Sequence, residues 1–273
     1  METGSDGSKA ILVVSFGTSY PETRKKTIDA IENEITGAFP EHRVLRAFTS
    51  GMIIKKLLKR DGVKVDNVTE ALERAVCDGV KALVVQPTHL MDGIEYGILK
   101  KALKGYGDKF EQISLGEPLL MSDRDFDELS AAIVERTSSF DDGRTAMVFM
   151  GHGTEASSNA DYEKLQEILI NKGFGNYYIG TVEAAPSIMD IVEKLRGRDY
   201  KRVVIYPLMV VAGDHANHDM AGDWEDSWKS ILEKEGYKVE PILEGLGELP
   251  GVRAIYARHV REAMGFSGNL GTP

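Results

Sequence analysis

The chain has 273 residues, of which 42% are hydrophobic, a formal net charge of -10 at pH 7 and one cysteine. This length suits two domains of ordinary size, and no apolar run is long enough to cross a bilayer. The acidic balance argues against non-specific binding to nucleic acid or to anionic membranes, and the single Cys77 excludes an internal disulfide or a multi-thiolate metal site.

The first nine residues, METGSDGSK, are polar and rich in glycine. They lack the apolar core of a signal peptide, so we expect a flexible leader. The chain is therefore expected to be cytoplasmic, unless an export signal has already been removed.

In the first half of the chain, strand patterns and helix patterns alternate. Short apolar runs predict strands over residues 9–15, 43–49, 81–86 and 111–115. Apolar residues at helical spacing predict helices over residues 22–35, 50–59, 68–76, 98–103 and 125–135. A loop that holds His89, Asp92, Gly93 and Glu95 is expected after the third strand.

The second half repeats this order. Strands are predicted over residues 145–150, 177–182, 202–206 and 239–243, and helices over residues 162–170, 187–195 and 252–264. Strands that alternate with helices form parallel sheets. The sequence therefore predicts an α/β fold.

The two halves also match in sequence. Residues 80–95 (VKALVVQPTHLMDGIE) align with residues 200–215 (YKRVVIYPLMVVAGDH) at an offset of 120. Residues 15–19 (SFGTS) align with residues 151–155 (GHGTE) at an offset of 136. Because the matching segments keep the same order, we infer an internal duplication.

The duplication predicts two similar, doubly wound domains with parallel sheets. The join is expected in the polar, turn-rich stretch 138–143. We therefore expect an N-terminal domain over residues 1–138 and a C-terminal domain over residues 139–273. Whether the closing helix 252–264 packs back on the first domain is left open by the sequence.

Three strands of the second half are each followed by a side chain that can bind a metal. His152 follows MVFMG, Glu183 follows YYIGTV and His215 follows VVIYPLMVVAGD. Neighbouring strands lie about 5 Å apart, so these residues can meet at one edge of the sheet. Two imidazoles and one carboxylate suit cobalt, nickel, iron or zinc better than magnesium or calcium. A hydrogen-bonding role in the loops is the alternative.

The repeat pairs Glu95 with His215 and Phe16 with His152. If the domains face each other across a cleft, Glu95 points toward the metal and takes protons or guides the ion. The alternative is that Glu95 is a solvated acid at the start of a helix, where acids are common. His218 is expected either to support the ligands or to lie on the surface.

Further side chains at the same strand ends are candidates for substrate binding: Ser15, Phe16, Thr18, Arg46, Thr88, His89 and Thr154. Arg46 could hold substrate carboxylates, and Lys55 and Lys56 could do so as well. For the two lysines, a solvated helix face is the simpler interpretation.

Common nucleotide and hydrolase signatures are absent from the sequence. Neither GxxxxGK[ST] nor a GxGxxG that follows a strand occurs, which argues against ATP-driven and nicotinamide chemistry. GxSxG is absent as well. We therefore expect no nucleotide cofactor.

The motifs taken together resemble one known family. FGTS, GHGT, RAFTSGMIIKKL, PTHLMDGIEY, GTVEAAP and PLMVVAGDHANHDM are similar to segments of the anaerobic-type sirohydrochlorin cobalt chelatases of cobalamin biosynthesis, the CbiK family of class II chelatases. The similarity covers nearly the whole chain, and GDHA and GTVE are its most specific motifs.

The resemblance implies a chelatase fold and ATP-independent insertion of Co²⁺ into sirohydrochlorin or its precorrin. It implies that His152, Glu183 and His215 bind the ion, that His152 also accepts a proton, and that Glu95 lies on the opposite wall. Insertion of Fe²⁺ or Ni²⁺, a homo-oligomer, and a carrier that binds metal or tetrapyrrole without catalysis are the alternatives.

The residues favour this chemistry on their own account as well. Metal insertion displaces two protons from pyrrole nitrogens, so a base that works near neutral pH is useful beside the ion, and His152 fits that role. Three protein ligands also leave positions open for the nitrogens of a macrocycle.

Overall fold

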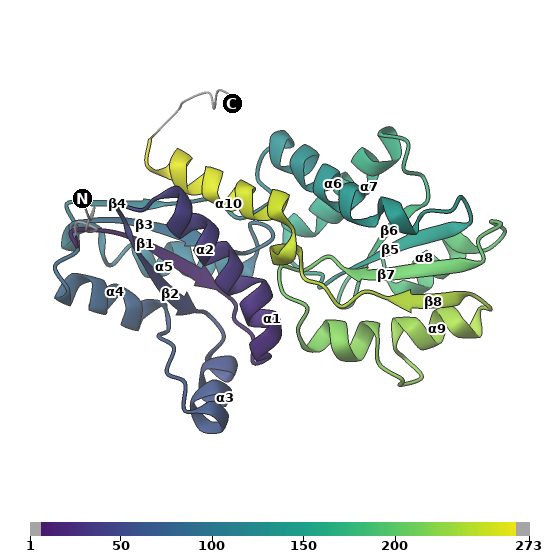
Figure 1. Ribbon diagram of the computed structural model, residues 1–273, viewed down its shortest axis with the longest axis horizontal. Helices are drawn as coiled ribbons and strands as arrows, with labels where there is room; N and C mark the ends of the chain where they lie inside the picture. The colour runs from purple at the N-terminus through teal and green to yellow at the C-terminus, as the bar shows by residue number, and fades with distance from the viewer. Residues whose placement is uncertain (1–6, 266–273) are drawn as a thin grey trace. The chain divides into compact units, whose positions relative to one another are not determined.

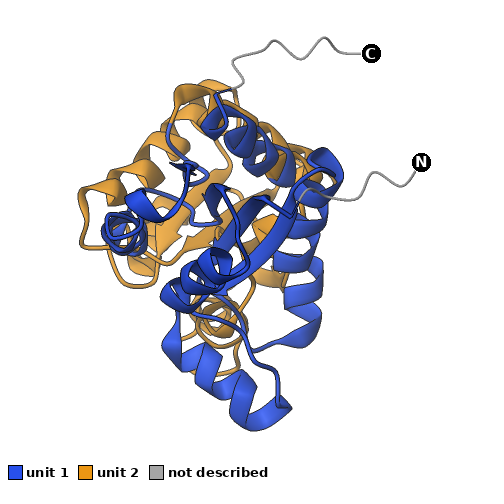
Figure 2. Cartoon of the chain, turned by 90° about the vertical axis from the view of Figure 1, so that its left-hand side faces the viewer, with its two compact units in different colours: residues 1–121, 253–273 blue, residues 122–252 orange. Residues whose placement is uncertain are grey.

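The structure, a computed structural model, describes residues 7–265, so residues 1–6 of the expected leader lie outside it. The chain forms two compact units (Figure 1, Figure 2). Unit 1 contains residues 1–121 and 253–273, and unit 2 contains residues 122–252.

Unit 1 is built on a parallel four-stranded sheet with the order β2-β1-β3-β4. Its strands are β1 (Lys9–Ser15), β2 (Arg43–Phe48), β3 (Ala82–Pro87) and β4 (Gln112–Leu115). Its helices are α1 (Pro21–Lys26), α2 (Ile28–Ala38), α3 (Gly51–Asp61), α4 (Val68–Cys77), α5 (Ile94–Leu103), a short 3-10 helix (Gly107–Lys109) and most of α10 (Pro250–Ala263).

Unit 2 has the same arrangement, with the strand order β6-β5-β7-β8. Its strands are β5 (Thr145–Gly151), β6 (Tyr177–Thr181), β7 (Arg202–Pro207) and β8 (Lys238–Pro241). Its helices are α6 (Asp123–Thr137), α7 (Ala160–Asn171), α8 (Ile188–Leu195), α9 (Trp228–Lys234), a π-helix (Ala216–Met220) and 3-10 helices at Ser138–Phe140, Ser157–Asn159 and Leu246–Glu248. Within residues 7–265, no helix is both long and apolar enough to span a membrane.

Burial of the inner strands β1 and β5 explains why their sequences are apolar runs. Every residue of β5 is buried, and in β1 only Lys9 is exposed. Strands covered on both faces need apolar side chains in both directions. The chain winds from β5 to β6 on one side and then to β7 on the other, so its direction reverses between β5 and β7. Ligands of open α/β sheets bind at such a switch point, outside the carboxyl ends of the strands.

The predicted fold class is confirmed, and all eight predicted strands are present. Two local expectations were wrong. The helix expected over residues 22–35 is interrupted at Thr27, whose backbone angles of φ -114° and ψ -81° are not helical. Helix α5 begins at Ile94, so Glu95 lies in its first turn and not in the preceding loop.

The division into units differs from the expected boundary at 138/139. Helix α6 belongs to unit 2, where Lys164 of α7 pairs with Asp123 at 2.7 Å. From Arg253 on, α10 belongs to unit 1, where the Tyr256 hydroxyl donates a hydrogen bond to the carbonyl oxygen of Thr88 at 3.1 Å. The chain therefore returns to unit 1 in its last helix.

The internal repeat is present in the backbone hydrogen bonds. The N–H of Ser50 donates to the carbonyl oxygen of Phe16 at 3.2 Å, and the N–H of Glu183 donates to that of His152 at 2.9 Å. Three further backbone hydrogen bonds of unit 1 have equivalents in unit 2, each written from N–H to carbonyl oxygen. Thr88 to Val14 corresponds to Leu208 to Met150, Gly93 to Met91 corresponds to Gly213 to Val211, and Gly97 to Gly93 corresponds to Asn217 to Gly213. Ser50 in unit 1 therefore occupies the position of Glu183 in unit 2.

Candidate metal centre

The structure brings His152, Glu183 and His215 together at the carboxyl edge of the sheet in unit 2. Each offers one ligand atom, and these atoms all lie within 4.8 Å of one another. The two imidazole rings meet edge to face, with centroids 4.7 Å apart and planes at 87°. His152 Nδ1 lies 3.6 Å from Glu183 Oε2. One divalent ion can therefore be bound by all three side chains.

The backbone around His152 is fixed by a close turn. Gly153 has φ +88°, and a Cβ at this position would lie 2.8 Å from the backbone nitrogen of Ala184. Only glycine adopts this conformation freely and allows this approach. Together with the hydrogen bond from the Glu183 N–H to the His152 carbonyl oxygen, the turn holds the loops after β5 and β6 side by side.

Asn159 joins the same two loops through its side-chain amide. Its Oδ1 accepts from the N–H of Thr154 at 3.1 Å, and its Nδ2 donates to the carbonyl oxygen of Ala185 at 2.8 Å. The Thr154 hydroxyl oxygen in turn accepts from the N–H of Ala156 at 3.1 Å. Thr154, predicted to bind substrate, is therefore engaged within its own loop.

Both imidazoles are oriented through Nδ1. In His215, Nδ1 lies 2.6 Å from Asp219 Oδ2, one turn further along in the π-helix. In His152, Nδ1 lies 2.9 Å from the carbonyl oxygen of Gly153. A carbonyl oxygen can only accept, and so can an ionised carboxylate, so each Nδ1 carries the proton. In the neutral form of such a ring, Nε2 keeps a lone pair that can bind a metal ion.

The candidate metal centre is exposed to solvent, whereas the strands that lead to it are buried. The side chains of His152, Glu183 and His215 are 46%, 57% and 36% exposed. Met150 of β5 and Ile205 of β7, in the strands that precede His152 and His215, are fully buried. An ion can therefore reach these three side chains from solvent.

In unit 1, the predicted hydroxyl groups are buried and used within the fold. Ser15, Thr18 and Thr88 are 2%, 3% and 4% exposed. Thr88 Oγ1 donates to Ser15 Oγ at 2.8 Å, and Thr18 Oγ1 accepts from the N–H of Tyr20 at 3.2 Å. These groups hold the strand ends together. Phe16, by contrast, is 51% exposed.

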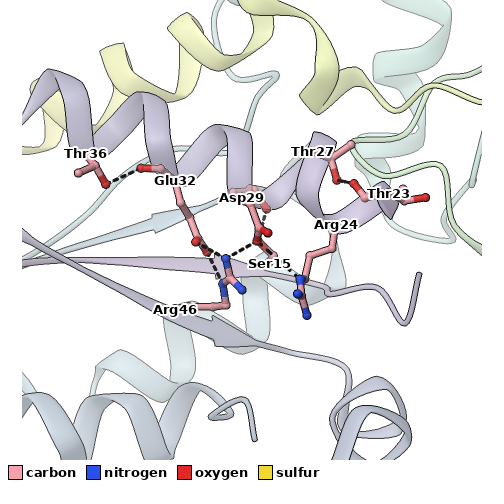
Figure 3. A network of polar contacts seen from close by, with 9 residues as sticks. Ser15, Thr23, Arg24, Thr27, Asp29, Glu32, Thr36 and Arg46 are labelled. Atoms are coloured by element: carbon pink, nitrogen blue, oxygen red, sulfur yellow. Dashed lines mark hydrogen bonds and ion pairs between the residues drawn. The ribbon is translucent and has the colours of Figure 1, made fainter. Parts of the chain in front are cut away.

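Arg46 was expected to hold substrate carboxylates, and the structure engages it with carboxylates of unit 1 (Figure 3). Its guanidinium donates to Glu32 and to Asp29 on α2, and Asp29 also lies 3.6 Å from Arg24. Burial opposes the charge of Arg46, but the hydrogen bonds that it donates to Glu32 and Asp29, together with their negative charges, leave its pKa above the ordinary value. Two acids thus already compensate its charge, and its observed contacts fasten α2 to β2.

His89 is only 9% exposed, and neither ring nitrogen has a hydrogen-bond partner within the described residues. Burial lowers its pKa to about 4. Its carbonyl oxygen accepts from Tyr256 of α10. His89 is therefore an uncharged imidazole at physiological pH.

Glu95 and His218 have different surroundings. Glu95 is half-buried in the first turn of α5, and it forms no ion pair within residues 7–265. His218 is 57% exposed, and its Nδ1 lies 3.2 Å from the carbonyl oxygen of Asp214. The cluster of ligand atoms found in unit 2 does not include His218.

Sequence reasoning missed three residues that support this centre. Asp219 orients His215, Asn159 joins two loops, and the Tyr162 hydroxyl accepts from the N–H of Gly153 at 3.3 Å. The four-residue spacing from His215 to Asp219 was a usable signal. Asn159 and Tyr162 had none, because their partners are set by loop conformation.

Fold and site together define an α/β protein of two units, with a solvent-exposed cluster of three side chains that can bind a divalent ion. The comparison with protein families makes this definition specific. A family model described as cobalt chelatase (CbiK) matches residues 9–265, and the chain belongs to this family.

Curated relatives support the same assignment. A protein of Salmonella typhimurium named sirohydrochlorin cobaltochelatase is 38% identical over 259 residues, covering 95% of this chain and 97% of the relative. A protein of Nitratidesulfovibrio vulgaris named sirohydrochlorin cobaltochelatase CbiKC is 31% identical over 258 residues, covering 94% and 90%.

Solved structures share the fold at low sequence identity. SirB of Bacillus subtilis, solved with Fe³⁺, has a TM-score of 0.67 and 15% identity, covering 93% of this chain and 95% of that chain. The sirohydrochlorin chelatase SirB of Bacillus subtilis subspecies spizizenii, solved with cobalt, has a TM-score of 0.63 and 14% identity, covering 96% and 97%. At these identities the likeness concerns the fold.

Proposed function

We propose that this chain inserts Co²⁺ into sirohydrochlorin without consuming a nucleotide. The observation that carries the proposal is the convergence of His152, Glu183 and His215 in a member of the cobalt chelatase family. The names of the curated relatives support sirohydrochlorin as the tetrapyrrole.

In this proposal, the ion is first bound by the three side chains of unit 2. They leave coordination positions open, which the pyrrole nitrogens occupy as the protein ligands leave. Insertion replaces two pyrrole N–H protons by Co²⁺, so two protons must be accepted. His152 Nε2 accepts one after releasing the ion, and Glu95 is proposed as a further acceptor. Asp219 keeps the ring of His215 oriented while its bond to the metal forms and breaks.

The donor set by itself does not choose cobalt. Two imidazoles and a carboxylate also bind Fe²⁺ and Ni²⁺. The affinity of such a site for divalent metals follows the same general series in most proteins, so it does not identify the metal that is inserted in the cell. Co²⁺ is proposed because of the family to which the chain belongs. A cytoplasmic location and a homo-oligomeric assembly complete the proposal, and cell fractionation and light scattering test them.

A turnover measurement tests the proposal. Purified protein at catalytic concentration is mixed with metal-free sirohydrochlorin and excess Co²⁺, Fe²⁺ or Ni²⁺, without nucleotide, and the absorption change is followed. We expect many equivalents of cobalt product for each protein, above the rate without protein. Saturation at one equivalent would instead indicate a carrier, and faster turnover with iron or nickel would change the proposed metal.

A further inference from the structure

Helix α3 contributes little to the core of unit 1. Of its 11 residues only Leu57 is buried, and Figure 1 shows the helix projecting away from the sheet of its unit. The helix after β6 in unit 2, α8, instead buries three of its eight residues. Packing against the sheet therefore does not explain most of the surface of α3.

The outer surface of α3 carries a basic face, formed by Met52, Lys55, Lys56 and Lys59. These positions follow the i, i+3, i+4, i+7 spacing, so they share one side of the helix. Met52 is 79% exposed, and the three lysines are exposed as well. Within residues 7–265, none of the three ammonium groups forms an ion pair or a side-chain hydrogen bond. The basic face is thus a local excess of free positive charge in a chain of net charge -10.

The basic face begins at the carboxyl edge of the sheet. Helix α3 follows β2 directly, and the N–H of Ser50 at its start donates a hydrogen bond to the carbonyl oxygen of Phe16. Ser50 occupies the position that the ligand Glu183 occupies in unit 2. An exposed Phe16 thus adjoins the start of a helix with an exposed thioether and three free ammonium groups. An apolar ring bordered by carboxylates complements this combination.

We propose that the basic face of α3 binds the peripheral carboxylates of the tetrapyrrole substrate. This inference rests on the proposed function, because sirohydrochlorin carries acetate and propionate groups around an apolar macrocycle. Free lysines attract these groups without a fixed geometry, and Met52 offers an apolar contact beside them. The lysines act on binding of the tetrapyrrole and not on metal chemistry.

The test compares two triple variants with equal changes in net charge. The first is Lys55→Gln/Lys56→Gln/Lys59→Gln. The control is Lys101→Gln/Lys104→Gln/Lys109→Gln, which removes exposed lysines at and beyond the far end of α5. For the first variant we expect KM for sirohydrochlorin to rise about tenfold, as for the loss of three exposed ion pairs, with kcat within about twofold. The control is expected to match the wild type.

Two further measurements make the test more specific: the dependence of KM on salt, and a variant in which arginine replaces the three lysines. Added salt should raise KM of the wild type more than that of the first variant, because screening acts on the charges that the variant lacks. Lys55→Arg/Lys56→Arg/Lys59→Arg should retain the wild-type KM. A first variant that behaves like the control would overturn this inference alone, whereas a wild type that inserts no metal would overturn the proposed function and this inference with it.

Discussion

At the carboxyl edges of their sheets, the two units share a backbone and differ in side chains. In unit 2 the edge carries His152, Glu183 and His215, the candidate metal centre. The equivalent positions of unit 1 carry Phe16 and Ser50, fixed by matching hydrogen bonds. Glu95 corresponds to His215 in the sequence repeat.

The candidate metal centre thus differs from the equivalent edge of unit 1 in a few side chains on a shared backbone. Gly17 in unit 1 has φ +101°, and its counterpart Gly153 has φ +88°. The turn after the first strand is therefore similar in both units, although only in unit 2 does it carry a candidate metal ligand, His152. The duplicated backbone supplies geometry, and the residues at its edge decide whether that geometry binds a metal ion.

The largest expected difference is between His152→Ala and the equivalent Phe16→Ala. The first variant removes a metal ligand and the proposed base, so insertion should slow by about a thousandfold. The second removes one apolar contact and should slow insertion by no more than about tenfold. Steady-state insertion assays measure both, and His218→Ala, which changes an exposed histidine near the site, is the control. Equal losses in the first two variants would contradict a metal centre confined to unit 2.

A smaller effect is expected for Asp219→Asn. An amide holds Nδ1 of His215 less firmly than a carboxylate does, so Co²⁺ affinity should fall by about 10 to 100-fold. Calorimetric titration of the purified protein with Co²⁺ measures this change. Asp223→Asn, which removes an exposed acid paired with Lys229, should leave affinity unchanged. Unchanged affinity in Asp219→Asn would show that this contact does not support the ligand.

His89 should make unit 1 sensitive to acid. Burial lowers the pKa of His89 from 6.5 to about 4 in the folded chain. Above pH 6.5 the ring is neutral in both states, and as the pH falls from 6.5 to 4 only the unfolded state takes up the proton. Stability is therefore lost in this window, by up to about 3 kcal/mol.

Urea unfolding at pH 7.5 and pH 4.5 measures this loss. The difference in unfolding free energy between the two pH values should be smaller for His89→Gln than for the wild type. His218→Gln, which changes an exposed histidine, should retain the wild-type difference. An equal difference in all three proteins would contradict the buried, uncharged state of His89.

The smallest expected effects are those of alanine substitutions at the two equivalent glycines, Gly153 and Gly17. Gly153→Ala and Gly17→Ala should each destabilise the chain by about 1 to 3 kcal/mol, because both force a side chain into the left-handed region and into close contact. Gly153→Ala should also weaken Co²⁺ binding, because it displaces the loop that carries Glu183. Thermal unfolding with and without Co²⁺ checks both effects. Weaker binding in Gly17→Ala would show that the edges are coupled.

The sequence predicted the strands well because β1, β3, β5 and β7 are apolar runs that end in glycine, proline or polar residues. It also predicted which strand ends carry His152, Glu183 and His215, since parallel strands align their carboxyl ends. It could not predict the partners of Arg46, because the pairing with Glu32 depends on how α2 lies on β2. The break at Thr27 was missed because the apolar spacing continues through it.

The most direct test of the metal centre is transfer of a bound ion. The protein is loaded with one equivalent of Co²⁺, freed of unbound metal, and mixed with metal-free sirohydrochlorin without nucleotide. We predict that one equivalent of cobalt product forms with the release of two protons, and that Glu183→Gln, which loses a charged ligand, transfers far less. An ion that stays on the wild-type protein while product forms only from free Co²⁺ would contradict the account.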